Sequence, residues 1–390
     1  MDIPETAADL SFGVELKFLV PFIRSGEVIA GLSKTCPVLK VPSQSSAHDL
    51  WNIAHEAIAD TIQRVPGQKA VTQRGLDASC FTEKSFWETH WIVKPSKSAV
   101  LAKDDPRYDG YLWIPVELNT PKFSWKCPHS LFTVEQVIRL LEQTYQLVSN
   151  HSCEVHVHVG RQDNQDISLS TLRRLAALCW LAEPVLRAVK DPASPNFDHT
   201  YTWSSPLRDH SRLAISLGDE EKKALSASAW CSDNGKASIA SRDHQALRRI
   251  GSCTSHLALA HLLTGTEPRY RRLGFNFNSF GDGNDNYPNK PNTFECRFLE
   301  GIIRSDMVTG WVMIVLSMAE ASLYDRGGAF RFETLVGRLL SSDQQASLSQ
   351  RLQVLCEDLR IHAVYYAPFV VKVQRDRHQG PNEITWRSSV

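Results

Sequence analysis

Two histidines and a glutamate alternate along one short stretch of the sequence, Cys153–Gly160. With the two-residue repeat of a β-strand, Glu154, His156 and His158 point to one side, and the β-branched valines between them point to the other. Two imidazoles and a carboxylate on one face, within roughly 13 Å, are typical of a metal or phosphate site. Taken alone, the stretch could also be a solvent-facing strand with incidental histidines.

Four further stretches alternate in the same way, with apolar residues on one side and polar residues on the other. They are Phe12–Leu19 with Glu15 and Lys17, Ile114–Asn119 with Glu117, Leu273–Asn278 with Asn276 and Asn278, and Thr293–Phe298 with Glu295 and Arg297. Such segments can pair into one largely antiparallel sheet whose apolar face is covered by helices. We therefore predict an α+β fold with a curved, largely antiparallel sheet, helices on its apolar face and the active site on the other face.

The predicted polar face gathers hard oxygen ligands together with imidazole. This combination suits Mg²⁺ or Mn²⁺ better than Zn²⁺, which favours thiolates or three close ligands. His156 is placed ahead of His158 as a ligand, because His158 could instead orient a neighbour or reach a substrate. The predicted metal ligands are Glu15, Glu117, His156 and Glu295.

Arg297 lies two residues from Glu295 on the same predicted face, where a planar guanidinium could hold a phosphoryl group beside the metal. Such an arrangement stabilises charge on a transferring phosphoryl group. The sequence contains neither G-x-x-x-x-G-K-[ST] nor G-x-G-x-x-G, so a nucleotide would lie on the sheet itself. The predicted contacts to ATP come from Arg297, Asn276, Asn278, Arg208 and His158.

Structural interpretations of the same residues remain open. Glu15 with Lys17 could form a solvated ion pair on an edge strand, and Glu295 with Arg297 could form a structural ion pair. The two asparagines could be ordinary polar-face residues. Glu154 could be a solvent-facing strand residue.

Composition narrows the functional class. The chain has 390 residues, with 43 basic residues balancing 43 acidic ones, so no excess charge points to nucleic acid or an anionic membrane. Nine cysteines without a C-x-x-C motif favour a reducing compartment. The first residues lack the basic and apolar parts of a secretory signal, and no apolar run has the length of a membrane span. We predict a cytoplasmic protein without nucleic-acid or membrane partners.

Helical periodicity fills the intervals between the predicted strands. Helices are predicted over residues 47–65, 133–148, 168–190, 243–263 and 305–324, with two or three more within 330–370. The second helix is expected to open with a capping box at Thr133. The aromatic stretch Phe86–Val93 favours a strand, and residues 216–236 show no clear period.

The domain organisation follows from the absence of repeats and clear linkers. We predict one domain over residues 1–390, with an insertion at 191–240 and a helical C-terminal elaboration at 326–390. The loop Gly281–Asn286 has the composition of a calcium loop but lacks its last glutamate, so a solvated hairpin turn is the better interpretation.

The order of these motifs resembles the amidoligase family, a part of the carboxylate–amine ligase group with the glutamine synthetase catalytic fold. The stretches that carry the resemblance are Phe12–Leu16, Val116–Pro121, His156–Gly160, Arg173–Ala176 and Thr293–Gly301. The resemblance implies ATP-dependent amide formation: ATP phosphorylates a carboxylate, an amine attacks the acyl phosphate, and phosphate leaves. The implied substrates are a small-molecule or peptide carboxylate and an amine, with Mg²⁺ or Mn²⁺ as the metal.

Carried over by position, the resemblance implies that His156 and Glu295 are metal ligands and that Arg297 binds phosphate. Glu15 matches the first glutamate of the family's Glu-x-Glu motif, but Lys17 stands where the second is expected. An ammonium group there repels a divalent cation, so one metal position is lost or replaced by the charge of the lysine. Glu117 matches the carboxylate of the third strand. The predicted catalytic residues are Glu295, Arg297 and Lys17.

A second departure from the family pattern is Ser96, at a position where an aspartate is often found. Both departures raise the local positive charge. Two alternatives to the ligase therefore remain. One is a catalytically degenerate member of the family that binds nucleotide or another ligand. The other is an oxygenase or hydrolase whose metal is held by His156, His158 and one carboxylate.

Overall fold

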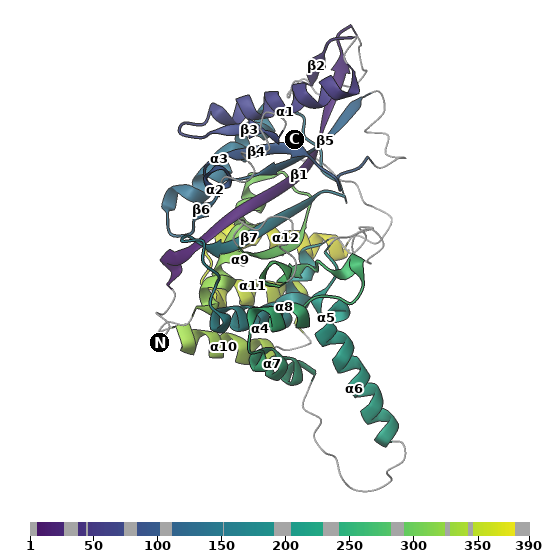
Figure 1. Ribbon diagram of the computed structural model, residues 1–390, viewed down its shortest axis with the longest axis vertical. Coiled ribbons are helices and arrows are strands. Elements are labelled where there is room, and N and C mark those ends of the chain that lie inside the picture. Colours follow the sequence, from purple (N-terminus) through teal and green to yellow (C-terminus); the bar gives the residue numbers. More distant parts are fainter. Residues whose placement is uncertain are drawn as a thin grey trace.

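β1 (Leu10–Arg24) is the long central strand of a mixed sheet (Figure 1). The computed structural model describes residues 6–26, 38–43, 46–73, 84–101, 111–150, 152–190, 204–228, 242–281, 292–323, 328–341 and 346–378. Within them, nine strands form one sheet in the order β3-β4-β5-β1-β7-β9-β8, and β2 and β6 also pair with β1. The β1–β5, β1–β7, β7–β9, β8–β9 and β4–β5 pairs are antiparallel, and only the β1–β2 and β3–β4 pairs are parallel.

The strands that flank β1 include the predicted ones. β5 (Leu112–Asn119) and β7 (Glu154–Arg161) pair with β1 on its two sides, and β9 (Phe294–Glu300) pairs with β7. The shorter strands are β2 (Leu39–Val41), β3 (Ala70–Thr72), β4 (Trp91–Pro95), β6 (Phe123–Ser124) and β8 (Phe275–Asn276).

Helices cover the apolar face of the sheet, as the alternating pattern predicts. α1 (Ala47–Gln63) contacts β4 and β5, and α9 (Ser305–Ser322) contacts β7 and β1. α3 (Pro128–Thr144) packs against both helices. The valines of β7 are buried beneath them, so the outward-pointing residues of the same strand are left to the polar face.

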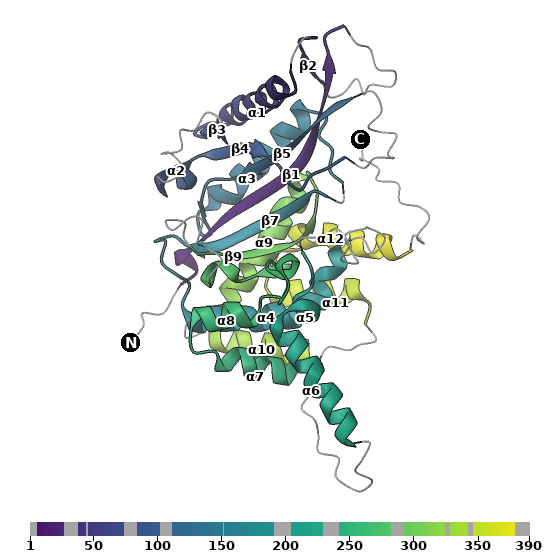
Figure 2. The ribbon, with the colours of Figure 1, turned by 45° about the vertical axis from the view of Figure 1, so that its right-hand side comes forward.

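A second group of helices packs behind α9 (Figure 2). It contains α4 (Leu169–Leu186), α10 (Gly328–Ser341), α11 (Leu348–Asp358) and α12 (Ala363–His378). The remaining helical elements are η1 (Ala7–Asp9), α2 (Lys84–Thr89), η4 (Arg187–Val189), α5 (Leu207–His210), α6 (Arg212–Ser228), α7 (Arg242–Ser252), α8 (His256–Leu262), η5 (Pro268–Tyr270) and η6 (Asn278–Phe280). None of the helices in the described ranges has the length and apolarity needed to cross a membrane.

Three of the sequence predictions about secondary structure, one strand and two helices, are wrong in detail. The predicted strand Phe86–Val93 is instead α2 followed by β4, because Trp91–Pro95 alone extends the sheet beside β5. α3 starts at Pro128 rather than at Thr133, whose hydroxyl donates to the His129 carbonyl inside the helix. The predicted helix over 243–263 is two helices, α7 and α8, separated by a short break.

Two other regions also differ from the sequence prediction. Residues 216–228, which show no clear period, belong to α6. β8 spans only Phe275–Asn276, and the chain then turns into η6, so Asn278 lies in a 3₁₀ turn rather than on the strand. The loop that follows Gly281, including the predicted hairpin turn, lies outside the described residues.

Candidate active site

The register of the strands gathers the polar residues onto one face. Glu15 on β1 pairs with His156 on β7, and Lys17 pairs with Glu117 on β5. His158 pairs with Glu295 on β9. Because side chains that are directly opposite in neighbouring strands lie about 5 Å apart, each of these pairs is within contact distance.

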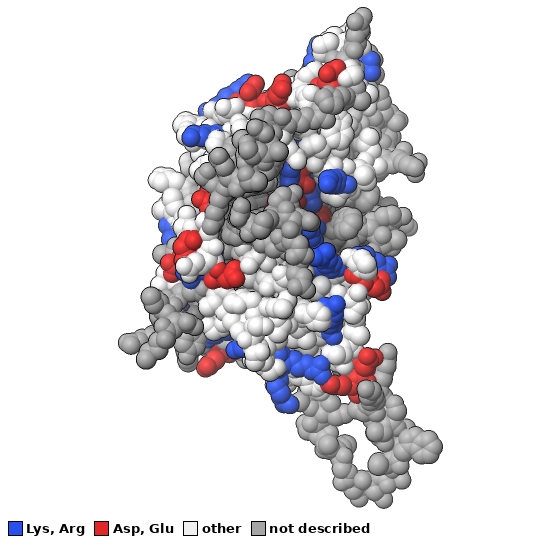
Figure 3. Space-filling view, in the orientation of Figure 1, with Lys and Arg blue, Asp and Glu red and all other residues white. Residues whose placement is uncertain are grey.

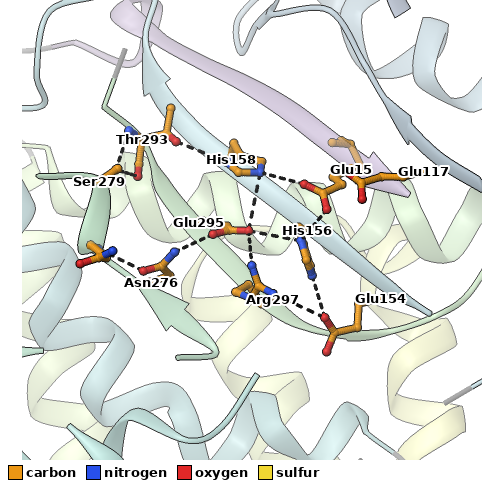
Figure 4. Close-up of polar contacts among 12 residues, drawn as sticks. Glu15, Glu117, Glu154, His156, His158, Asn276, Ser279, Thr293, Glu295 and Arg297 are labelled. Carbon is orange, nitrogen blue, oxygen red and sulfur yellow. Dashed lines mark hydrogen bonds and ion pairs between the residues drawn. The ribbon is translucent and has the colours of Figure 1, made fainter. Parts of the chain in front are cut away.

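Glu15, His158 and Glu295 form a group that could hold a metal ion (Figure 4). One ligand atom from each lies within 4.8 Å of the others. The His158 Nε2 atom is 3.7 Å from the Glu15 Oε2 atom and 3.8 Å from the Glu295 Oε1 atom. The first and last of these residues were predicted as ligands, and His158 was predicted as a cofactor contact.

Neighbouring side chains fix the orientation of two members of this group. The His158 Nδ1 atom is 3.3 Å from the Thr293 hydroxyl, which leaves Nε2 facing the two carboxylates. The Asn276 amide donates to the Glu295 Oε2 atom at 2.6 Å. Histidine and carboxylate ligands of metals are commonly held by such outer hydrogen bonds, because these bonds set the ring tautomer and the carboxylate angle.

His156 lies deeper, at the centre of a group of carboxylates, with 1% of its side chain exposed. Its Nε2 atom is 2.9 Å from the Glu154 Oε2 atom, and its Nδ1 atom is 3.2 Å from both Glu15 and Glu295. Burial and the charges of nearby cations lower the pKa of His156, but the charge and hydrogen bond of Glu15 outweigh them and raise it to about 9. Both ring nitrogens of His156 face carboxylates, whereas His158 belongs to the group that could hold a metal ion, so the geometry favours His158 over the predicted His156 as the metal ligand.

A β-bulge in β9 lies opposite this histidine. Val155 pairs with Leu299 and Val157 pairs with Cys296, so His156 alone lies opposite two residues of β9, Arg297 and Phe298. An extra residue in one strand bends that strand and redirects its side chains. Because of the bulge, Arg297 lies opposite His156, and its guanidinium is close to this histidine.

Arg297 is buried between two carboxylates rather than open to solvent. Its NH1 group donates to the Glu295 Oε1 atom at 2.7 Å, and its NH2 group is 3.7 Å from the Glu154 Oε2 atom. Burial raises the pKa of Glu154, but the hydrogen bond and charge of His156, together with Arg297, lower it to about 2. Both carboxylates are therefore ionised at neutral pH. The predicted phosphate contact of Arg297 stays a prediction.

The other side of the face contains two lysine–glutamate pairs. The Lys17 Nζ atom is 3.1 Å from the Glu15 Oε1 atom, and the Lys94 Nζ atom is 2.6 Å from the Glu117 Oε1 atom. Burial and the Glu15 charge raise the pKa of Glu117, and the two lysines oppose the rise. Glu117 is not part of the three-residue group above, so its predicted role as a ligand stays a prediction.

Two predicted cofactor contacts lie in other surroundings. The Asn278 backbone N–H donates to the Asn276 side chain at 3.0 Å, which ties η6 to the site. Arg208, on α5, pairs with Asp243 at 2.8 Å and donates to the Trp180 carbonyl. These contacts hold α5 against α4 and α7 and do not involve the polar face of the sheet.

Sequence reasoning missed three contributors to the site. Lys94 lies one residue beyond the predicted strand Phe86–Val93, so the two-residue repeat does not place it on the polar face. Thr293 was read only as the first residue of its strand, and Glu154 was left open as solvent-facing although it is buried. The alternation of Glu154 with His156 and His158 was the only sequence signal for the last of these.

Basic and acidic side chains meet in a hollow at the height of the sheet (Figure 3). The basic groups predominate along its edge in this view, with acidic side chains between them. Mixed charge with accessible ammonium groups is suited to a polyanionic ligand that brings its own divalent cation.

A family model described as "Putative amidoligase enzyme" matches residues 9–249. A comparison with curated proteins gave no match. The matched part includes Glu15, Glu117, His156 and His158 and ends before β8 and β9, which contribute Asn276, Glu295 and Arg297.

Proposed function

Because this chain belongs to the amidoligase enzyme family, we propose that it is an ATP-dependent ligase that joins a carboxylate to an amine through an acyl phosphate. The observation that carries this proposal is the convergence of Glu15, His158 and Glu295 on the polar face of an antiparallel sheet. We further propose that this sheet is a glutamine synthetase-like catalytic sheet. ATP, a small-molecule or peptide carboxylate and an amine are the proposed substrates.

The three residues fit a magnesium or manganese ion. An octahedral ion with oxygen ligands at about 2.1 Å separates its ligand atoms by about 3.0 Å when they are adjacent and about 4.2 Å when they are opposite. The distances of 3.7 Å and 3.8 Å from His158 Nε2 exceed the adjacent value by less than 1 Å, so a bound ion would draw the three side chains slightly closer together. When bound, the ion would neutralise charge on the phosphates of ATP and on the transferring phosphoryl group.

The chain's own residues would act around the two substrates. Asn276 and Arg297 hold Glu295 in place through both of its oxygens, so its position does not depend on a ligand. In the first step a carboxylate oxygen of the substrate attacks the γ-phosphorus and ADP leaves. In the second step the amine attacks the acyl carbon, the C–O bond to phosphate breaks, and the nitrogen loses a proton. Both steps develop negative charge on oxygen, which nearby fixed cations stabilise.

Lys17 and Lys94 are the cations nearest the more accessible carboxylates. We propose that the Lys17 ammonium supplies, beside Glu15 and Glu117, a positive charge that a second divalent cation would otherwise supply. Its ion pair with Glu15 and its position opposite Glu117 in the β1–β5 register support this role. Lys17 would then contribute to phosphate binding, and no second metal ion would have to bind at this position.

The geometry favours the ligase over an oxygenase or hydrolase. A facial triad of two histidines and one carboxylate needs a neutral imidazole from both His156 and His158. The Nε2 atom of His156 faces Glu154, and its Nδ1 atom faces Glu15 and Glu295. Among the described residues, the metal-binding group found has one histidine and two carboxylates.

A catalytically degenerate member remains a second candidate function. It is favoured by the two lysine pairs, because they neutralise Glu15 and Glu117 without any metal. Such a protein would bind ATP on the same face but would not hydrolyse or transfer its phosphate. Nucleotide binding and ADP release distinguish the two candidates.

The test is an ADP-release assay with the full chain, ATP and Mg²⁺, run across a panel of amino acids, dicarboxylates and amines. The proposal predicts that ADP release requires both an acid and an amine, and that mass spectrometry detects a product equal to their sum less one water. The matched control is Glu320→Ala, which removes a glutamate paired with Lys126 and Trp125 outside the site. ADP release that consumes neither substrate would contradict the ligase, and ATP binding without ADP release would support the degenerate member.

A further inference from the structure

A buried network of charges continues from the site towards the C-terminal helix. Glu154 at the start of β7 pairs directly with Glu300 at the end of β9. Each of these residues is 2% exposed. Two carboxylates directly opposite each other in a sheet repel, and the repulsion is largest where water is excluded. Their juxtaposition therefore requires cations nearby.

The cation beside Glu300 comes from α12. The Lys372 Nζ atom is 2.6 Å from the Glu300 Oε1 atom and 2.5 Å from Asp376, one helical turn further along. Burial lowers the pKa of Lys372, but Glu300 and Asp376 outweigh it, so the ammonium keeps its charge. α12 lies beside α9 and η4, so its position is fixed by apolar packing as well as by this ion pair (Figure 2).

A second lysine interacts electrostatically with both carboxylates. Lys190, at the end of η4, is 3% exposed, and its ammonium group is attracted by the charges of Glu154 and Glu300. It also donates a hydrogen bond to the Ser204 hydroxyl. Glu154 is also compensated by His156 and Arg297, so without Lys372 it is Glu300 that would depend on Lys190 alone among these cations.

Glu154 is the member of this network that touches the site. It accepts from His156 at 2.9 Å and lies 3.7 Å from the Arg297 NH2 group. If Glu300 lost its partner, Lys190 and Arg297 would be drawn towards the uncompensated charge, and Glu154 would lose part of its own compensation. The position of the His156 ring therefore depends on a contact made by the last described helix.

We infer that α12 is part of the catalytic unit and that Lys372 is a positioning residue: by neutralising Glu300, it allows Glu154 to hold His156 and Arg297 in place. The consequence for turnover rests on the proposed function, but the structural coupling does not. Lys372 and Glu300 both lie outside residues 9–249, which the family model matches.

The experiment records the ring ¹⁵N resonances of His156, assigned with a His156→Gln variant, in the full chain without ligand. Lys372→Met is expected to shift them, although the substituted side chain does not touch the ring. The double variant Glu300→Gln/Lys372→Met removes both charges together, so its His156 resonances are expected to return close to the wild-type positions. If Lys372→Met alone does not fold, Glu300→Gln is recorded instead, and a shift of the His156 resonances that is reversed in the double variant is expected.

The matched control is Val373→Ala, which removes apolar packing from the next residue of the same helix but changes no charge. It is expected to lower the melting temperature and leave the His156 resonances in place. Unshifted resonances in Lys372→Met, equal shifts in Val373→Ala, or a double variant that stays shifted would each overturn the inference.

Turnover is then measured in the same variants. A loss of at least about tenfold in kcat is expected for Lys372→Met, with recovery in the double variant. If the wild type releases no ADP with any substrate pair, the ligase proposal fails while the resonances still decide the coupling. If the wild type is an active ligase but its His156 resonances ignore Lys372, only the present inference fails.

Discussion

The polar face of the sheet has two sides that use the same residue types differently. On the lysine side, strands β1, β5 and β4 pair Glu15 with Lys17 and Glu117 with Lys94, and the Lys94 side chain is 23% exposed. On the histidine side, strands β7, β9 and β8 bury their carboxylates, and the Glu154 side chain is only 3% exposed. Glu117 is held by an ion pair with the partly exposed Lys94. Glu15 lies at the border of the two sides, because it contacts Lys17 as well as His156 and His158. On the histidine side, Glu154 and Glu295 each have several buried partners.

The difference in burial indicates that the two sides of the polar face have different functions. Lys94 is 23% exposed whereas Lys17 is only 6% exposed, so Lys94 is the lysine that can leave its carboxylate for an incoming phosphate at little cost, because exposed ion pairs contribute about 1 kcal/mol or less. A buried network that loses one member leaves an uncompensated charge, which costs about 3–5 kcal/mol. We therefore expect the lysine side to adapt to the nucleotide and the histidine side to stay fixed.

The largest effect is expected for Glu295→Ala. This residue is a proposed metal ligand and also the partner of Asn276, His156 and Arg297, so its loss should lower kcat for ATP turnover by about 10³-fold. Steady-state ADP release measures it, with Glu320→Ala as the control. Retained turnover would mean that the histidine side is not the site of chemistry.

Arg297→Lys is expected to lower kcat by about 10²-fold, because one ammonium cannot donate to Glu295 and approach Glu154 at the same time. The same assay measures the loss, and Arg304→Lys, an exposed pair with Asp306, serves as the control. Equal activity of Arg297→Lys and wild type would show that a point charge suffices at this position.

Lys17→Gln sharpens the comparison from the other side. Removal of the ammonium leaves Glu15 and Glu117 without this cation, so the Mg²⁺ concentration needed for half-maximal turnover should change by about tenfold, and Lys17→Glu should raise the dependence on Mg²⁺. Mg²⁺ titrations of ADP release measure the change. A dependence identical to that of the wild type would remove the proposed role of Lys17 as a resident positive charge. Complete inactivation by Lys17→Glu would show that the lysine has a role of its own.

The smallest effect concerns Glu183, a buried carboxylate whose close partners are two backbone N–H groups, of Leu207 and Arg208, at 2.6 Å and 2.7 Å. Burial raises its pKa to about 7, and these hydrogen bonds oppose the rise only in part. A carboxyl whose pKa is raised on folding stabilises the fold while it is protonated and loses that contribution as pH rises through the folded value. The difference in unfolding free energy between wild type and Glu183→Gln should fall by about 1 kcal/mol between pH 6 and pH 8.

Denaturant unfolding at several pH values measures this difference. Glu183 contrasts with Glu154, whose nearby His156 and Arg297 keep its pKa low despite equal burial. A difference that stays constant from pH 6 to pH 8 would show that Glu183 is ionised throughout, as the site carboxylates are.

The two-residue repeat was sufficient to predict which side chains share the polar face. Each of the alternating segments with Glu15, Glu117, His156 and Glu295 is a strand of the same sheet, because burying one face of a strand leaves no freedom for the other. The two-residue repeat does not predict how deeply each polar side chain is buried. His156 is the buried centre of the polar face, and His158 is the more exposed histidine and a member of the group that could hold a metal.

Packing by residues distant in the sequence explains the other differences between the predictions and the structure. Glu154 is buried because η4 and α12 cover the end of β7 and β9, and neither helix is signalled by the strand's own residues. The aromatic residues before Trp91 suggested a strand, but local preference gave way to the packing that makes α2. The Arg208 prediction relied on a long loop, and the structure instead gives Arg208 an ion pair with Asp243 on α7.

The most direct test of the account is pulsed EPR of Mn²⁺ bound to the full chain together with a non-hydrolysable ATP analogue. The account predicts ³¹P coupling from the analogue and ¹⁴N coupling from one imidazole, with the nitrogen coupling lost in His158→Gln and kept in His156→Gln. Absence of phosphorus coupling, or a nitrogen coupling that survives His158→Gln, would contradict the assignment of Glu15, His158 and Glu295 as the metal site of an ATP-dependent ligase.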